Sequence, residues 1–410
     1  MFKKLIIVLI ILCSLLFYDF KLLGKFSKIL ELAGIGLMLV TSIFYAVYDN
    51  SFRFKHNFSL PILIILLSLP FSMYVANLFH NQSIGVSLYS QRSIYYYLLY
   101  FVLHQLKIKP KEFERIFFFL AIVYIALYLL QYFLFPTIIF NASVFKDRGT
   151  LRMFLYGLSY MMIAYFFALQ VLLRQNQLKY IIFLMIALTI IIMIGSRMLL
   201  FSVAAVTLFN LIIEKRIKSK LAIYGLVLTG MVLLFLAFQN VFEELISVTR
   251  ETREEGMENI RVKAARYFLS RFFPNTFAYI FGNGATGAHS EYSAIVGFMS
   301  KKYGYFLSDI GIIGNYINYG VFFVIGVLGI LYKSLKLKIQ PGFNYIKYFV
   351  VLNALCLIVA GGFAQSDFIV LVAITLYMLD VSKSMFNIQN PDEIPINQES
   401  PVQTENATET

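Results

Sequence analysis

The sequence is poor in charged residues. Only 14% of its 410 residues are Asp, Glu, Lys or Arg, while 60% are hydrophobic and the mean hydropathy is +0.75. A typical soluble domain carries roughly 25% charged residues. A water-soluble core of this size has no room for so much apolar surface, so lipid is the expected solvent for most of the chain. This excludes a cytoplasmic enzyme, a secreted disulfide scaffold and a disordered protein.

Cysteine and histidine are also scarce. The two cysteines lie in apolar runs far apart in the sequence, and the four histidines are isolated: Cys13, Cys356, His56, His80, His104 and His289. Their spacing is not that of metal ligands. The chain has no Gly-rich phosphate loop and no paired-acid motif of the kind that holds a divalent metal on a nucleotide sugar. We therefore expect neither a metal nor a cofactor.

Long apolar runs dominate the rest. Because a bilayer core needs about 20 apolar residues per helix, the sequence predicts an all-α polytopic membrane protein with about twelve transmembrane helices. The predicted spans are 5–19, 29–48, 60–79, 84–104, 115–135, 153–173, 179–195, 198–213, 221–240, 305–331, 345–363 and 366–385. The first follows Lys3 and Lys4 and is interpreted as an uncleaved signal anchor, because no small-x-small cleavage site follows it.

The distribution of Lys and Arg predicts the orientation. With the N-terminus inside, nineteen of them fall in short inner loops, whereas seven fall in short outer loops: Lys21, Lys25, Lys28, Lys146, Arg148, Arg152 and Arg197. The positive-inside rule then places both termini in the cytoplasm. Much of the net charge of +13 is thus a topology signal, and no nucleic acid partner is expected.

Four regions follow from this topology. Residues 1–240 form a membrane domain with helices 1–9, 241–304 a long outer (periplasmic) loop, 305–385 a membrane domain with helices 10–12, and 386–410 a disordered cytoplasmic tail. Within the loop, Ser247 to Phe273 predicts an amphipathic helix on the outer membrane face, with Ile260, Ala264 and Tyr267/Phe268 at helical spacing. A second short helix is expected around 288–302.

This topology restricts the chemistry. All inner loops are too short for a nucleotide-binding domain, so any reaction belongs to the outer face, where the substrate must arrive already activated. A lipid-linked pyrophosphate is the obvious substrate carried by the membrane. Arginines are expected to bind it, because a guanidinium pairs with phosphate through two parallel hydrogen bonds. The outer-face candidates are Arg148, Arg152, Arg197, Arg261, Arg266 and Arg271.

Arg92 is the one basic residue well inside a predicted span. A charge there is costly, so it is expected to face the bundle interior or a cavity. Two interpretations stay open for it: a further contact to an anionic substrate, and a structural partner for a carbonyl or carboxylate.

Several motifs together resemble the bacterial O-antigen polymerase and ligase family. They are the Tyr-rich spans, the tight Gly195-Ser196-Arg197 hairpin, and the loop order of arginines, Pro274-Asn275, Gly282-Asn283-Gly284 and His289-Ser290. Arg271 and Gly282 fit the Arg-x(10)-Gly pattern of such polymerases, and Gly311-Ile312-Ile313-Gly314 is similar to the family's Gly-x-x-Gly. His289 lies twice as far from Gly311 as the ligase pattern has it, which favours polymerase over ligase.

The resemblance implies a metal-independent glycosyltransferase without cofactors. A polyprenyl-pyrophosphate-linked oligosaccharide would be the donor, and a hydroxyl of an incoming lipid-linked repeat unit would attack its anomeric carbon. Clustered arginines would stabilise the leaving pyrophosphate. His289, Asp309 or Glu291 would accept the proton, with His289 and Asp309 preferred. A flippase and a chain-length regulator are the expected membrane partners, and the product would be O-antigen, capsule or exopolysaccharide.

Two other functions stay open. A ligase of the same fold would transfer finished glycan to a different acceptor. A lipid-linked glycan flippase or secondary transporter would need acidic residues or broken helices near the bilayer midplane. The predicted spans contain almost no Asp or Glu, which disfavours this carrier.

Overall fold

The computed structural model describes residues 2–49, 56–142, 144–147, 150–175, 177, 179–213, 229–230, 235–359 and 362–389, and it is predominantly helical. In this part of the chain, five helices are long and apolar enough to cross a membrane: Gly24–Tyr48, Ser59–His80, Pro110–Leu134, Leu307–Lys336 and Ser366–Ile388. Three shorter apolar helices lie between them in the sequence: Leu158–Arg174, Lys179–Ile194 and Arg197–Ile213. The chain is therefore predominantly helical, as in an all-α membrane protein, and the count of twelve spans stays a prediction.

The first half of the chain contains nine α-helices and one small sheet among the described residues. They are α1 (Phe2–Ser14), α2 (Ser27–Asp49), α3 (Ser59–His80), α4 (Ile84–Ser90), α5 (Leu99–Leu106), α6 (Pro110–Leu134), β1 (Val144–Asp147), β2 (Thr150–Met153), α7 (Leu158–Gln175), α8 (Lys179–Ile194) and α9 (Arg197–Ile213). The predicted span 221–240 lies mostly outside the described residues.

The second half supplies the polar helices and the last three long or apolar ones. They are α11 (Gln239–Glu255), α12 (Ile260–Arg271), α13 (Thr276–Phe281), α14 (Glu291–Tyr303), α15 (Gly311–Lys336), α16 (Asn344–Cys356) and α17 (Ser366–Gln389). Short 3-10 helices join several elements: η1 (Leu16–Asp19), η2 (Gly24–Phe26), η3 (Arg92–Leu98), η4 (Gly256–Glu258), η5 (Leu307–Ile310), η6 (Pro341–Phe343) and η7 (Gly362–Ala364).

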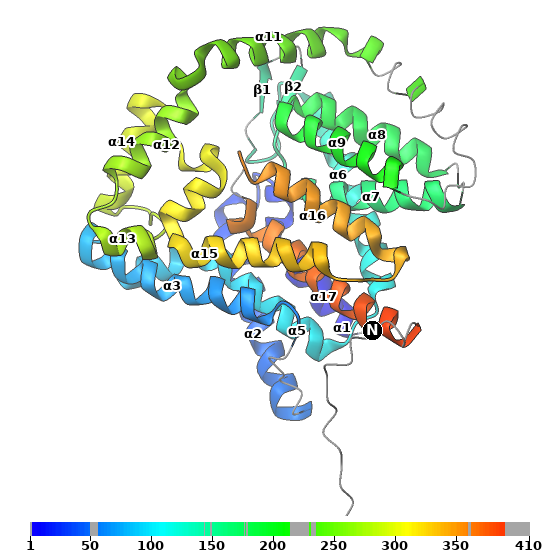
Figure 1. The fold of residues 1–410 in the computed structure, drawn as a ribbon, viewed down its shortest axis with the longest axis horizontal. Coiled ribbons are helices and arrows are strands. Elements are labelled where there is room, and N and C mark those ends of the chain that lie inside the picture. The colour runs from blue at the N-terminus through cyan, green and yellow to red at the C-terminus, as the bar shows by residue number, and fades with distance from the viewer. Residues whose placement is uncertain are drawn as a thin grey trace, which may run out of the picture.

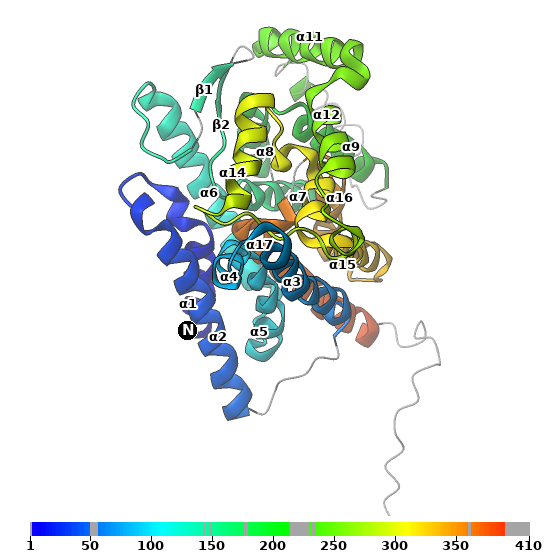
Figure 2. The ribbon, with the colours of Figure 1, turned by 90° about the vertical axis from the view of Figure 1, so that its left-hand side faces the viewer.

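The apolar helices pack as one bundle, in which α3 and α15 lie side by side, as do α6 and α7 (Figure 1). α1 and α2 form an antiparallel pair along one flank (Figure 2). α11 crosses the end of the α8–α9 hairpin, while α12, α13 and α14 cover the end of α3 and α15 (Figure 1).

Lysines gather where one set of helix ends meets, which we call the basic face. Lys3 at the start of α1 donates to the Leu106 carbonyl at the end of α5, and Lys4 pairs with Glu112 at the start of α6. Lys333 near the end of α15 donates to the Asn57 carbonyl just before α3.

The opposite set of helix ends meets beneath the polar helices, and we call it the loop face. Ser366 at the start of α17 donates to the Ser14 carbonyl at the end of α1. Ile312 at the start of α15 donates its amide to the Leu357 carbonyl after α16. The β1–β2 hairpin and helices α11 to α14 belong to this face (Figure 1).

α15 is broken at Gly320, whose φ of +77° and ψ of −171° interrupt the helical ladder. The break leaves carbonyls without helical donors, and the loop supplies replacements: Asn283 donates its amide to Ile317 at 2.8 Å, and Gly284 to Asn318 at 2.7 Å. In an apolar solvent such groups must be satisfied by protein. Gly282 approaches so closely that an added Cβ would lie 2.5 Å from the Gly320 amide nitrogen.

Three predicted elements differ from the structure. The span 84–104 is divided into α4, η3 and α5, and at the first boundary the buried Gln91 side chain donates to Ser72. The first span ends early, since α1 stops at Ser14 and residues 16–19 adopt positive φ. The β1–β2 hairpin was not expected in an all-α chain.

The outer segment also differs in its packing. The predicted helix 247–273 is two helices, α11 and α12, joined through Gly256. The apolar face of α12 was expected to lie on the membrane, but Ala264 and Phe268 are buried in a cluster with Ile310 and Ile317 of the α15 region. The second helix, α14, is close to its predicted place. α17 extends to residue 389, and the rest of the predicted tail lies outside the described residues.

The contact between Gly282 and Gly320 predicts a stability effect. We expect Gly320→Ala to lower the free energy of unfolding by about 3 kcal/mol, because a Cβ combines a strained φ with backbone contacts of 2.4 Å to Ile280 and Phe281. The sequence has no Trp and Cys13 is buried, so a thiol-reactive dye can follow thermal unfolding in detergent.

Gly297→Ala in α14 is the matched control, because nothing lies within 4 Å of its Cβ position. It should stay within about 1 kcal/mol of the parent, on the stabilising side. Equal stability of the Gly320 and Gly297 variants would contradict the role of the break.

Candidate functional site at the loop face

Arg152 is fixed by the small sheet. β1 and β2 pair antiparallel with Asp147 opposite Thr150, so the Arg152 side chain reaches back along the hairpin to form an ion pair with Asp147 at 2.7 Å. Its Nε donates to the Ile194 carbonyl at the end of α8, at 3.1 Å. Only 11% of the Arg152 side chain is exposed.

Arg197 is fixed by the tight turn between α8 and α9. α8 ends at Ile194 and α9 begins at Arg197, so the predicted hairpin is confirmed. Gly195 has a φ of +62° and packs against the Arg152 side chain. Both arginines therefore lie at the turn between α8 and α9.

α11 covers this turn. Its residues Val241 and Leu245 are buried against Ile192 of α8, which holds the helix across the end of the hairpin. One turn farther along α11, Thr249 and Thr252 accept hydrogen bonds from Arg197 Nη1 at 3.3 and 3.2 Å. In the described part of the chain, these neutral hydroxyls are the partners of the Arg197 guanidinium.

Arg261 completes a cluster that we call the arginine triad: Arg152, Arg197 and Arg261. Arg197 lies close enough to Arg261 and Arg152 for their positive charges to act on its guanidinium, with Glu251 as the nearest opposing charge. Arg261 begins α12 and is exposed. With the acids Asp147 and Glu251 counted, the five groups carry a net charge of about +1.

The other predicted loop arginines do not join the triad. Residues five apart on a helix of 3.6 residues per turn point about 140° away from each other, so Arg261, Arg266 and Arg271 diverge. Arg266 acts on Glu258, whose pKa is lowered mainly by its hydrogen bond to Lys263 at 2.5 Å. Arg271 is exposed at the end of α12, and Arg148 lies outside the described residues.

Arg92 belongs to a buried ion pair. It binds Glu31 of α2 at 2.7 Å, with 21% and 8% of the two side chains exposed. It also donates to the Tyr89 carbonyl and lies over the Tyr89 ring. Of the two interpretations left open by the sequence, the structural partner is the one these contacts favour.

The predicted proton acceptors all lie on the loop face, but each contacts different residues. His289 is exposed and has a left-handed φ of +65° just before α14. Asp309 is exposed in η5, where it accepts from Ser308. Glu291 begins α14 and accepts from Asn81 at 3.1 Å. No contact among the described residues joins His289 to Asp309.

His80 is a polar residue that the sequence reasoning missed. At the end of α3, its Nε2 lies 2.9 Å from Asn283 Oδ1, and its ring stacks on Tyr292 with the ring centres 4.3 Å apart. Asn283 and Tyr292 are fully buried. Because Asn283 also binds the broken region of α15, His80 links α3 to the loop. His80 and Asn283 are 203 positions apart, so no local sequence pattern connects them.

The argument against a carrier needs correction. Three acids are buried in or beside the apolar bundle: Glu31 in α2, and Asp367 and Asp380 in α17. Each half of the chain also has an interrupted apolar segment, at η3 and at Gly320. The predicted spans therefore hold more buried acids than expected, with Asp367 and Asp380 toward opposite ends of α17, and each was missed because it stands alone in its apolar run.

Comparison with known proteins does not assign the chain to a family. No family model matches the chain, and no curated protein matches it. The resemblance to polymerases and ligases therefore rests on the motifs alone.

The pairing of Arg92 with Glu31 predicts a non-additive effect on stability. Glu31→Gln leaves a largely buried guanidinium without its carboxylate and should lower the free energy of unfolding by about 3 kcal/mol, as should Arg92→Gln. The double variant should be no worse than either single one. A double-mutant cycle from thermal unfolding measures this coupling, and additive losses would contradict a structural pair.

Proposed function

We propose that this protein is a polymerase that joins polyprenyl-pyrophosphate-linked oligosaccharide repeat units into a surface polysaccharide. The reaction takes place at the loop face, on the outer side of a bacterial inner membrane. The observation that carries the proposal is the arginine triad. The three arginines come from separate segments: Arg152 packs against the α8–α9 turn that holds Arg197, and the charges of Arg152 and Arg261 both act on Arg197.

An anionic ligand explains this arrangement best. Arg197 is held by two hydroxyls of α11 and repelled by two guanidiniums, so a pyrophosphate there removes a repulsion and gains bidentate hydrogen bonds. Arg152 is held by Asp147 and the Ile194 carbonyl, while Arg261 is exposed near the start of α12. The site lies at a helix end, where a lipid-borne pyrophosphate reaches protein without crossing the hydrocarbon.

The chemistry needs charge stabilisation and one proton acceptor. The acceptor hydroxyl oxygen attacks the anomeric carbon, the bond from that carbon to the pyrophosphate oxygen breaks, and the hydroxyl proton passes to a base. The triad stabilises the charge that develops on the leaving pyrophosphate, so no metal is required at this face. His289 and Asp309 are the proposed bases, with Glu291 as the third candidate.

The polymerase needs substrate delivery and length control, so we propose a flippase and a chain-length regulator as membrane partners. Arg266 and Arg271 are exposed on α12 and would contact the glycan or the lipid surface instead of the pyrophosphate.

The orientation is the first test. A reporter domain inserted at Gly256, in the turn between α11 and α12, should be located outside the cytoplasm, and one fused after residue 389 should be located inside. The expectation follows from the lysines gathered at the basic face. A cytoplasmic signal from the Gly256 insertion would contradict both the orientation and the proposed enzyme.

The triad is tested by chain length. In a strain that lacks the protein, Arg197→Ala should restore polymerisation about 10²-fold more slowly than the parent, because one contact to the developing charge is lost. Arg197→Lys should also lose most activity, since Lys supplies charge without bidentate geometry. Surface-glycan length and a membrane assay with lipid-linked repeat units measure both.

Arg250→Ala is the matched control. Arg250 is exposed next to Thr249 on α11 but points about 100° away from it around the helix, so chain length should stay normal. Normal rates for Arg197→Ala and for Arg261→Ala would show that the pyrophosphate binds elsewhere. Deletion that leaves single repeat units on the surface supports a polymerase, whereas accumulation of free lipid-linked polymer indicates the ligase.

A lipid-linked glycan flippase is the second candidate. The interrupted segments at η3 and Gly320 and the buried acids favour it. Repeat units that stay on the cytoplasmic leaflet after deletion would assign this function instead.

A further inference from the structure

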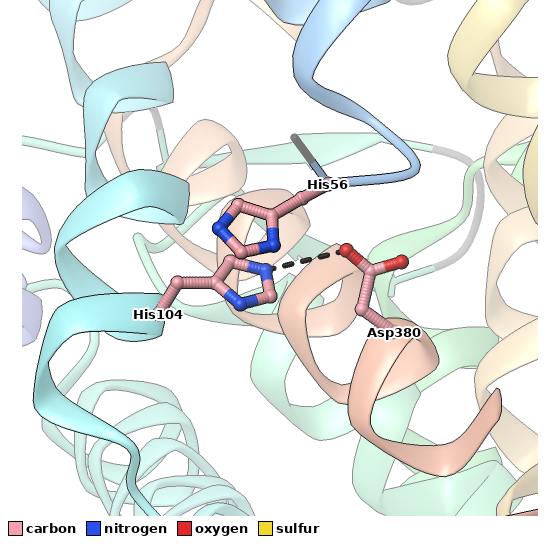
Figure 3. Close-up of side chains that lie close together, drawn as sticks. All are labelled: His56, His104 and Asp380. Atoms are coloured by element: carbon pink, nitrogen blue, oxygen red, sulfur yellow. Dashed lines mark ion pairs between the residues drawn. The ribbon is translucent and has the colours of Figure 1, made fainter. Parts of the chain in front are cut away.

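Two histidines that are isolated in the sequence meet at the basic face. His56 precedes α3, His104 lies in α5, and Asp380 lies near the end of α17 (Figure 3). The imidazole rings are stacked with their centres 3.6 Å apart. His104 Nε2 lies 3.2 Å from Asp380 Oδ2, and one ligand atom from each residue lies within 4.8 Å of the others.

The carboxylate is held firmly in place. Asn57 Nδ2 donates to Asp380 Oδ1 at 2.7 Å, and the Tyr100 hydroxyl donates to Asp380 Oδ2. Asp380 is buried, and its carboxylate is 6% exposed. Such orienting hydrogen bonds are typical of metal-ligating carboxylates. His104 Nε2 is buried and faces Asp380 Oδ2 without making a well-aligned hydrogen bond to it.

The residue types and their spacing fit a metal ion. Two imidazoles and one carboxylate form a three-ligand set that binds zinc or ferrous iron and leaves positions open. Ligand atoms around a tetrahedral zinc lie about 3.3 Å apart, given Zn–N bonds of about 2.0–2.1 Å. The ligand atoms lie within 4.8 Å of one another, and the stacked imidazoles must rotate for both to bind one ion.

The cluster opens into a cavity of about 1000 Å³. Three lysines line it, and two of them are fixed on Asn57: Lys333 on its carbonyl oxygen at 2.8 Å and Lys383 on its side-chain oxygen at 2.9 Å. Lysines oppose a bare cation, but they stabilise a metal that carries an anion. The open position therefore suits a small anion, such as phosphate, which the cavity can admit.

We propose that His56, His104 and Asp380 bind one divalent transition-metal ion, with an open coordination position that faces the lysine-lined cavity. The site lies at the opposite end of the bundle from the arginine triad. It is therefore independent of the proposed glycosyl transfer, and a failure of one does not affect the other.

The test is metal binding by the purified full-length protein in detergent. After removal of metal with a chelator, equilibrium dialysis against Zn²⁺ should give one equivalent per chain. Co²⁺ should give the visible absorption of a tetrahedral site. His104→Gln and His56→Gln should each weaken binding at least about 100-fold, and inorganic phosphate should strengthen binding to the parent protein.

Two further variants separate ligation from folding. Tyr100→Phe removes one hydrogen bond to Asp380 and keeps all three ligands, so it should weaken binding about tenfold. His80→Gln is the matched histidine control at the loop face and should bind Zn²⁺ as the parent does. Thermal unfolding of each metal-free variant establishes that it is folded.

Two results would overturn the proposal. One is Zn²⁺ binding that is equally tight in folded His56→Gln, His104→Gln and parent proteins. The other is phosphate binding to the metal-free protein that survives His104→Gln and is lost in Lys383→Met. That second result would assign the cavity to an anion alone.

Discussion

Much of this structure depends on satisfying backbone hydrogen bonds where water is excluded. The break at Gly320 leaves carbonyls inside an apolar helix without helical donors. The backbone amides of Asn283 and Gly284 donate hydrogen bonds to these carbonyls instead. The polar loop is therefore part of the bundle and not an appendage to it. Because Asn283 also binds His80, one short segment ties α3, α15 and α14 together, and it fixes the surface on which any loop-face substrate rests.

Polar side chains in the bundle obey the same constraint. Tyrosine hydroxyls donate to carbonyls on neighbouring helices, as Tyr96 does to Glu31 and Tyr97 to Phe363. Arg92 and Glu31 neutralise each other across α2 and η3. A charge that has such a partner is explained by stability alone. Arg197 differs, because its guanidinium donates to two neutral hydroxyls. Arg152, which pairs with Asp147, resembles Arg92 in this respect.

Features that follow from local chemistry could be predicted from the sequence. Apolar runs predicted the long helices, and Gly195-Ser196 predicted the tight turn between α8 and α9. The helical spacing of Ala264 and Phe268 predicted the buried face of α12. The break at Gly320 could not be predicted, since a glycine in an apolar run is ordinary until another backbone approaches it. The membrane placement of α12 was wrong for a related reason: periodicity reveals an apolar face but not what covers it.

The two candidate sites show how far sequence spacing can mislead. Arg261, Arg266 and Arg271 look like one cluster in the sequence, yet the helix spreads them, and of the three it is the charge of Arg261 that acts on Arg197 of α9. His56, His104 and Asp380 look unrelated, yet the start of α3, the end of α5 and the last part of α17 bring them together. In a bundle of this kind, residues far apart in sequence meet where helix ends lie at the same level, and polar groups are least costly at those ends. The candidate sites therefore lie at the two faces, and the pairing of helix ends decides which residues meet.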